Sequence, residues 1–189
     1  MKNIYTVPNL LTGYRFAISP LLLLVLQPGR DEMLFLLAFL LFLSGALTDL
    51  ADGYLARKHK IESVLGKLMD PLADKVLVAT PLIMLIPLGR IPAWVSLLII
   101  SRELAVTGLR GLAAATGIVV SASGLGKLKS IFQYTALCIL IFPAPLLPIP
   151  FLYDFGRFIL YVSLVLTLWS GFDYFIKLQN IYLNPPEES

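Results

Sequence analysis

Apolar residues in this chain gather in long runs, and polar residues separate the runs at regular intervals. A helix needs about 20 apolar residues to cross the hydrocarbon core of a bilayer. Six runs come close to that length: residues 8–28, 33–57, 68–88, 91–112, 128–147 and 153–176. The pattern predicts an all-α fold, an integral membrane bundle of six transmembrane helices. Residues 1–183 are expected to form a single domain, and residues 184–189 a disordered tail.

The composition agrees with a membrane protein. Of the 189 residues, 58% are hydrophobic and only 14% are charged, which excludes the surface of an ordinary soluble protein. The net charge of +3 favours contact with anionic membrane lipids, and no motif is typical of a nucleic-acid-binding module. Cys138 is the single cysteine, so an internal disulfide is excluded, and His59, the single histidine, is expected to be a solvated loop residue.

Charged residues fall at the ends of the predicted spans. If the chain crosses the membrane up and down, only Arg30, Arg90 and Arg157 of the fifteen Lys and Arg residues lie on one side. Because cytoplasmic loops carry an excess of Lys and Arg, this distribution predicts a multi-pass protein of the cell (inner) membrane with both termini in the cytoplasm. Ionisable residues are costly at membrane depth, so the polar pocket that faces the cytoplasm is a candidate functional site.

Four aspartates stand among apolar residues around the second and third spans. Asp49 and Asp52 are three residues apart and Asp70 and Asp74 four, so in helices each pair projects from one face. The polar loop 57–62 permits a hairpin that brings both pairs to the same depth. Clustered carboxylates in apolar surroundings need protons, basic partners or cations. Their oxygen ligands favour two hard divalent ions, Mg²⁺ or Mn²⁺, which suits phosphoryl transfer.

The same stretch follows the pattern D-x2-D-G-x2-A-R-x8-G-x3-D-x3-D at every fixed position. This pattern resembles the signature of the CDP-alcohol phosphotransferases. The resemblance implies a metal-dependent membrane enzyme that works as a homodimer. It also implies that Asp49, Asp52, Asp70 and Asp74 hold the two metal ions, and that Asp74 is in addition the general base.

The resemblance also implies a site for the cytidine diphosphate group of the donor substrate. The opening Pro-Asn-Leu-Leu-Thr-x-x-Arg of residues 8–15 is similar to that of bacterial members of the family. The implied binding residues are Asn9, Thr12, Asp52, Gly53, Ala56, Arg57 and Gly66. Two structural alternatives stay open: Asn9 and Thr12 would also serve to cap or pair helices, and the small residues would also serve tight helix packing.

Basic residues gather at the ends of the fourth and fifth spans, where Arg102, Arg110, Lys127 and Lys129 are found. Glu103 could neutralise one arginine, but the remaining positive charge favours a phosphate-bearing acceptor substrate. Anchoring to anionic lipid headgroups is the alternative for these residues. The run from Ser101 to Gln133 resembles bacterial family members whose acceptor is glycerol 3-phosphate.

The expected reaction is therefore transfer of the phosphatidyl group from CDP-diacylglycerol to glycerol 3-phosphate, giving phosphatidylglycerophosphate and CMP. The nearest alternative is another acceptor, such as phosphatidylglycerol in a cardiolipin synthase or inositol phosphate in a phosphatidylinositol phosphate synthase. A divalent-cation transporter is an alternative of a different class. It predicts acids spread through the depth of the membrane, whereas the acids here lie on one side.

Overall fold

The computed structural model describes residues 7–59, 64–115 and 124–183. Within these ranges, the side chains of residues 7–9, 49–59, 64–68, 70, 115, 124–125 and 180–183 are outside the description. The described chain forms six α-helices and one short 3-10 helix, without a strand, which confirms the all-α prediction. They are α1 (Val7–Val25), α2 (Glu32–His59), α3 (Val64–Met84), α4 (Ala93–Ala115), α5 (Gly124–Ile141), η1 (Ala144–Leu146) and α6 (Leu152–Leu183).

Glycines and prolines define the turns between these helices. Gly29 and Gly89 adopt φ values of 77° and 68°, a conformation that is strained for residues with a Cβ atom. The Pro-rich segment 143–150 forms η1 and extended chain, as expected for a segment that cannot continue α5. Pro71 lies inside α3, which continues through it to Met84.

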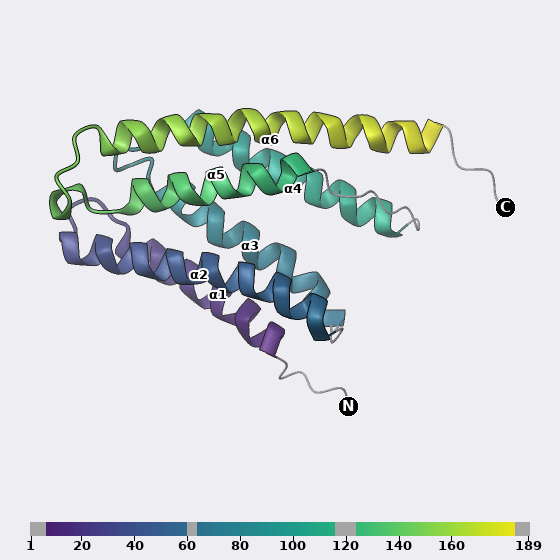
Figure 1. The fold of residues 1–189 in the computed structure, drawn as a ribbon, viewed down its shortest axis with the longest axis horizontal. Helices are drawn as coiled ribbons and strands as arrows, with labels where there is room; N and C mark the ends of the chain where they lie inside the picture. The colour runs from purple at the N-terminus through teal and green to yellow at the C-terminus, as the bar shows by residue number, and fades with distance from the viewer. Residues whose placement is uncertain (1–6, 60–63, 116–123, 184–189) are drawn as a thin grey trace.

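The helices form two groups of three, which diverge from one end of the bundle (Figure 1). In the first group α1 packs against α2 and α3, and in the second group α6 packs against α5 and α4. Contacts of α3 with α4 and of α2 with α5 join the groups. The connections 26–31, 85–92 and 142–151 lie together at the end where the groups meet, which we call the closed end (Figure 1).

The groups are held together by a continuous apolar core. Leu22, Phe42, Leu77 and Leu137 are fully buried in it. Gly156 allows α6 to approach α5 closely, since a Cβ atom there would lie 2.9 Å from side-chain atoms of Ile139 and Leu140. The helices α5 and α6 are thus closely packed near the closed end.

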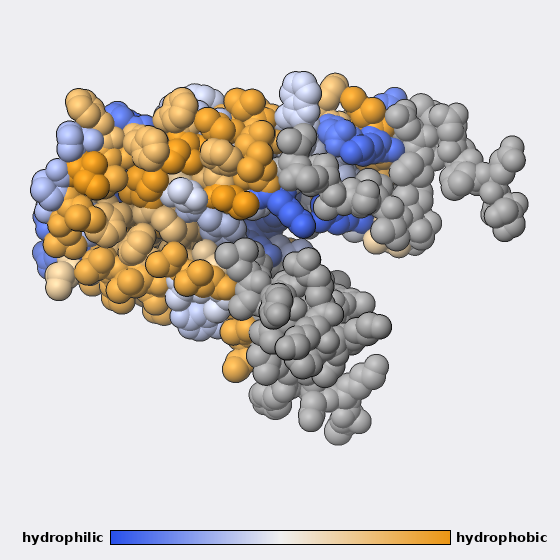
Figure 2. Space-filling view, in the orientation of Figure 1, coloured by the Kyte–Doolittle hydropathy of each residue, from blue (hydrophilic) through white to orange (hydrophobic). Residues whose placement is uncertain are grey.

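The outer surface is also strongly apolar (Figure 2). Large side chains such as Phe172 and Trp169 are more than two-thirds exposed. Among the described residues, one helical stretch, Leu152–Gln179, is long and apolar enough to cross a membrane, and Leu10–Val25 and Glu32–Thr48 are shorter apolar helices. The number of spans and the orientation of the termini remain predictions.

Arg90 connects α2, α5 and α6 at the closed end. Its guanidinium carbon lies 4.7 Å from the ring centroid of Phe35 and 4.3 Å from that of Tyr153. Nη1 donates to the carbonyl oxygens of Leu140, at 2.6 Å, and Ile141, at 3.2 Å, at the end of α5. Burial lowers the pKa of Arg90 below its ordinary value. Aromatic faces and helix-terminal carbonyls offset that loss of hydration.

Candidate active site

A cavity of about 1510 Å³ opens between the two groups of helices. Figure 2 shows the hollow between them, with hydrophilic surface at its base. Its lining is charged where the groups diverge, with residues from α3, α4, α5 and α6. Toward the closed end the lining becomes apolar and includes Phe142, Leu147 and Ile149. The cavity can therefore receive a molecule with a polar and an apolar part.

Asp74, the predicted general base, lies on the wall of this cavity. It forms an ion pair with Arg15, which comes from α1 and whose side chain is 0% exposed. The Asp74 side chain keeps 29% exposure. A buried guanidinium needs a partner of opposite charge, so Arg15 stabilises the ionised carboxylate and holds it at the cavity wall.

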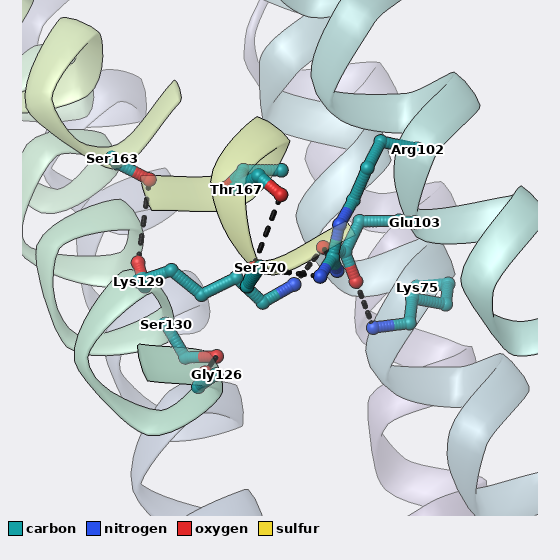
Figure 3. Close-up of polar contacts among 9 residues, drawn as sticks. All are labelled: Lys75, Arg102, Glu103, Gly126, Lys129, Ser130, Ser163, Thr167 and Ser170. Atoms are coloured by element: carbon teal, nitrogen blue, oxygen red, sulfur yellow. Dashed lines mark hydrogen bonds and ion pairs between the residues drawn. The ribbon is translucent and has the colours of Figure 1, made fainter. Parts of the chain in front are cut away.

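Glu103 forms the centre of a second charged group. Its Oε2 accepts from Lys75 Nζ, and its Oε1 accepts from Lys129 Nζ and, at 2.9 Å, from Arg102 Nη1. Figure 3 shows these side chains around Glu103. The cations come from α3, α4 and α5, so the cluster joins the two groups of helices. We call these four residues the Glu103 cluster.

The sixth helix supports Arg102 from the other side. Arg102 Nη2 donates to Ser170 Oγ at 2.7 Å, and Ser170 Oγ in turn donates to the carbonyl oxygen of Thr167 at 3.1 Å (Figure 3). A Cβ atom at Gly171 would lie 3.0 Å from Arg102 Nε. Glycine at this position therefore leaves room for the arginine side chain.

The other two predicted basic residues also line the cavity. Arg110 and Lys127 are both exposed. The Arg110 guanidinium carbon lies 5.8 Å from the ring centroid of Tyr174, a buried residue of α6. All four basic residues predicted from the sequence thus reach one cavity. Glu103 forms ion pairs with Arg102, Lys129 and Lys75. From the sequence, it was expected to neutralise only one arginine.

The predicted metal site can be described only in part. Positions 49 and 52 fall within α2 and positions 70 and 74 within α3, so the two helices that the hairpin requires are present. Thr12 is buried in α1. The remaining side chains predicted for metal or nucleotide binding lie outside the described part: Asn9, Asp49, Asp52, Gly53, Ala56, Arg57, Gly66 and Asp70. Among the described side chains, no three potential ligands gather.

Asp74 is the one described member of the predicted ligand set, and it fits that role. Its partly exposed carboxylate faces a cavity large enough for a phosphate-bearing substrate. Carboxylate oxygens are the ligands that hard divalent ions prefer. The described residues are therefore compatible with a divalent ion at this wall.

The site predicted from the sequence does not include Arg15, Lys75 or Glu103. A signal existed for two of them, because Arg15 and Glu103 each stand in an apolar run and a buried charge needs a counter-charge. Their partners were not evident, since Arg15 and Asp74 are 59 residues apart.

Comparison with known proteins gives a consistent result. The sequence pattern of the family described as CDP-alcohol phosphatidyltransferase matches residues 5–169. The CDP-diacylglycerol–glycerol-3-phosphate 3-phosphatidyltransferase of Bacillus subtilis is 40% identical, over 92% of this chain and 95% of the relative. The protein of the same name from Rickettsia typhi is 38% identical, over 93% and 96%. A probable phosphatidylglycerophosphate synthase of Mycobacterium tuberculosis is 36% identical, over 91% and 81%.

Proposed function

The chain belongs to the CDP-alcohol phosphatidyltransferase family, and we propose that it transfers the phosphatidyl group of CDP-diacylglycerol to glycerol 3-phosphate. The products are phosphatidylglycerophosphate and CMP. The observation that carries this proposal is the placement of Asp74 and the Glu103 cluster on the wall of one cavity. A base and an anion-binding group then face the same bound acceptor, as this reaction requires.

Asp74 acts as the general base in this proposal. Its carboxylate takes the proton of an acceptor hydroxyl, and the hydroxyl oxygen attacks the phosphorus that carries diacylglycerol. The bond between this phosphorus and the CMP oxygen breaks, and CMP leaves with the electron pair. Arg15 supports the step by keeping Asp74 ionised and directed at the cavity.

Two divalent cations, Mg²⁺ or Mn²⁺, are part of the proposal, held by Asp49, Asp52, Asp70 and Asp74. When bound, such ions supply positive charge that stabilises the diphosphate and the departing CMP. The proposed contacts to the cytidine diphosphate group come from Asn9, Thr12, Asp52, Gly53, Ala56, Arg57 and Gly66. Arg102, Arg110, Lys127 and Lys129 are proposed to bind the phosphate of the acceptor.

A membrane setting suits these substrates. We propose a multi-pass protein of the cell (inner) membrane that forms a homodimer, with its site facing the cytoplasm. The exposed apolar side chains and the apolar length of Leu152–Gln179 support this setting. The acyl chains of the donor can then remain in lipid while the soluble acceptor enters from water.

The test is CMP release by the purified protein in detergent, with CDP-diacylglycerol and Mg²⁺. The acceptors compared are glycerol 3-phosphate, glycerol, phosphatidylglycerol, inositol, inositol phosphate and serine. Release that depends on glycerol 3-phosphate alone is expected. Release with only phosphatidylglycerol or inositol phosphate would keep the family and overturn the acceptor. If no acceptor released CMP from folded, metal-binding protein, uptake of divalent ions into proteoliposomes would test the transporter alternative.

A further inference from the structure

We infer that Ser170 and Gly171 of α6 are positioning residues, which hold the guanidinium of Arg102 in the orientation in which it lines the large cavity. The inference rests on the proposed function, in which Arg102 binds the phosphate of the acceptor. It concerns a part of the chain that the family pattern does not cover, because the match ends at residue 169. Both residues act through Arg102 and not by a contact of their own with the substrate.

The orientation of Arg102 depends on few contacts. Its side chain is 12% exposed, and among the described residues it donates one hydrogen bond from each terminal nitrogen of the guanidinium. Nη1 donates to Glu103 on the same helix, and Nη2 donates to Ser170 on α6. Nε has no hydrogen-bond partner in the described part of the chain. Of the hydrogen bonds that the structure describes for this guanidinium, the one to Ser170 alone reaches another helix.

The hydroxyl of Ser170 is arranged to accept this bond. Ser170 is 3% exposed, and its Oγ donates to the carbonyl oxygen of Thr167 at 3.1 Å (Figure 3). Because a hydroxyl has one proton and two lone pairs, its oxygen remains an acceptor for Arg102 Nη2, 2.7 Å away. Serine is uncharged, so this bond orients the guanidinium without adding a negative charge that would repel a bound anion.

Gly171 holds the same side chain by close contact. A Cβ atom at this position would lie 3.0 Å from Arg102 Nε and 3.1 Å from Arg102 Cγ. The arginine therefore runs against the backbone of α6, and a larger residue would push it away. Two adjacent residues of α6 thus fix Arg102, one by a hydrogen bond and the other by the space that it leaves.

This arrangement bears on how the acceptor binds. Arg102 lines the same cavity as Asp74, the proposed base. A guanidinium that is already held in its bound orientation loses little freedom when it binds an anion, whereas one that turns freely must be ordered first. Loss of the contacts with α6 should therefore weaken acceptor binding more than it slows the chemical step.

Ser170→Ala is the main test, because it removes the hydrogen bond and little volume. In CMP-release assays, we expect the KM for glycerol 3-phosphate to rise roughly fivefold. The kcat at saturating acceptor and the KM for CDP-diacylglycerol should stay close to those of the unaltered protein. An unchanged KM for glycerol 3-phosphate in folded Ser170→Ala would overturn the inference. So would a fall in kcat with both KM values unchanged, which indicates a purely structural role.

Ser96→Ala is the matched control. Ser96 belongs to the same helix as Arg102, is 2% exposed and donates to the carbonyl oxygen of Leu82 at 2.7 Å. It lines neither the large cavity nor the second described cavity. Its substitution removes a similar buried hydrogen bond between helices, so it should cost similar stability and change neither KM.

A double variant tests whether Ser170 acts through Arg102. Arg102→Met alone removes the guanidinium, and adding Ser170→Ala to it should raise the KM for glycerol 3-phosphate no further. Effects of residues that act through one contact are not additive in this way. A further fivefold rise in the double variant would show that Ser170 acts independently of Arg102 and would overturn the inference.

Gly171→Ala guards against a failure of Ser170→Ala to fold. The added methyl group displaces the arginine and leaves the Ser170 hydroxyl in place, so the KM for glycerol 3-phosphate should again rise roughly fivefold. If Ser170→Ala did not fold, an unchanged KM in Gly171→Ala would refute the positioning role.

A spectroscopic experiment separates this inference from the proposed function. Nitrogen NMR of arginine-labelled protein in detergent, without substrates, reports whether a guanidinium is fixed, since hindered rotation about the Cζ–Nε bond gives separate signals for the two Nη atoms. The signals of Arg102 are identified by their loss in Arg102→Met. They should be separate in the unaltered protein and merge in Ser170→Ala.

The two kinds of failure remain distinct. If the unaltered protein released no CMP with glycerol 3-phosphate, the proposed function would fail, and the spectra would still decide the role of Ser170. Merged Arg102 signals in the unaltered protein, or separate signals in both proteins, would refute that role.

Discussion

The two ends of the bundle hold partly buried arginines in different ways. At the closed end, Arg90 lies between two aromatic rings and donates to two carbonyl oxygens of α5. Where the groups diverge, Arg102 shares Glu103 with two lysines, and its Nε has no hydrogen-bond partner among the described residues. The protein thus supplies Arg90 with uncharged partners and Arg102 with a charged one.

From this difference we expect Arg90 to have a structural role and Arg102 a role in substrate binding. Arg90 contributes to stability by joining α2, the start of α6 and the end of α5. The Glu103 cluster holds three cations beside a cavity, where a bound anion can reach them. Substitutions at the closed end should therefore change stability, and substitutions in the cluster should change substrate binding.

The largest effect is expected for Asp74→Asn, which tests whether the open side of the bundle carries the chemistry. Removing a general base typically costs a factor of 10² to 10⁴, so the rate of CMP release should fall roughly a thousandfold. The thermal unfolding of the variant, measured in the same detergent, serves as the control for folding. Retention of more than about a tenth of the rate would exclude Asp74 as the base.

The next effect concerns the closed end. Arg90→Met should lower the free energy of unfolding by about 3 kcal/mol, because two ring contacts and charge-assisted hydrogen bonds are lost. Both KM values should remain unchanged at a temperature where the variant is folded. Arg157→Gln, which removes a partly exposed arginine at the same end, should change stability by less than about 0.5 kcal/mol. An altered KM for either substrate in Arg90→Met would contradict the prediction that substitutions at the closed end change stability and not substrate binding.

Close packing between α5 and α6 gives a smaller effect on stability. Gly156→Ala places a Cβ atom 2.9 Å from side-chain atoms of Ile139 and Leu140. It should lower the free energy of unfolding by about 2 kcal/mol, as for other overpacked sites. Gly108→Ala is the matched control, since a Cβ atom there meets nothing within 4 Å. Chemical denaturation of both variants tests this, and equal stability would show that α6 can move away.

The smallest predicted effect is a difference in the KM for glycerol 3-phosphate between substitutions of two lysines of α5. Lys129 is buried and pairs with Glu103, whereas Lys127 is exposed at the cavity. Lys129→Met should raise the KM for glycerol 3-phosphate about tenfold, and Lys127→Met only about twofold to threefold. The smaller effect should disappear at high salt, because exposed charges are screened. If Lys127 proved the more important residue, the acceptor phosphate would bind outside the Glu103 cluster.

Much of the fold follows from the sequence because apolar runs and turn residues act locally. The predicted runs 33–57 and 91–112 correspond to α2 (Glu32–His59) and α4 (Ala93–Ala115) within a few residues. The break at 143–150 was evident from its prolines. These features depend on neighbours in the chain, so a single sequence is enough to reveal them.

For the candidate site, the sequence predicts which types of residue take part but not which residues contact one another. Basic residues around one pocket could be expected from the charge pattern, and the structure brings Arg102, Arg110, Lys127 and Lys129 to one cavity. The sequence did not indicate that Glu103 pairs with three cations, since two of them come from other helices. Nor did it reveal that Tyr174 is buried beside Arg110, because helix rotation decides which residues of α6 face inward.

The ion pair between Arg15 and Asp74 also bears on how the protein is made. Both residues belong to α1–α3, which the ribosome completes before it reaches α4. At about 5–20 residues per second, several seconds pass between the synthesis of Asp74 and that of Lys129. The proposed base can therefore meet its buried arginine in the nascent chain before the acceptor site exists. A ribosome-bound chain long enough for Asp74 to have left the exit tunnel, but arrested before Lys129 is added, should already contain this pair.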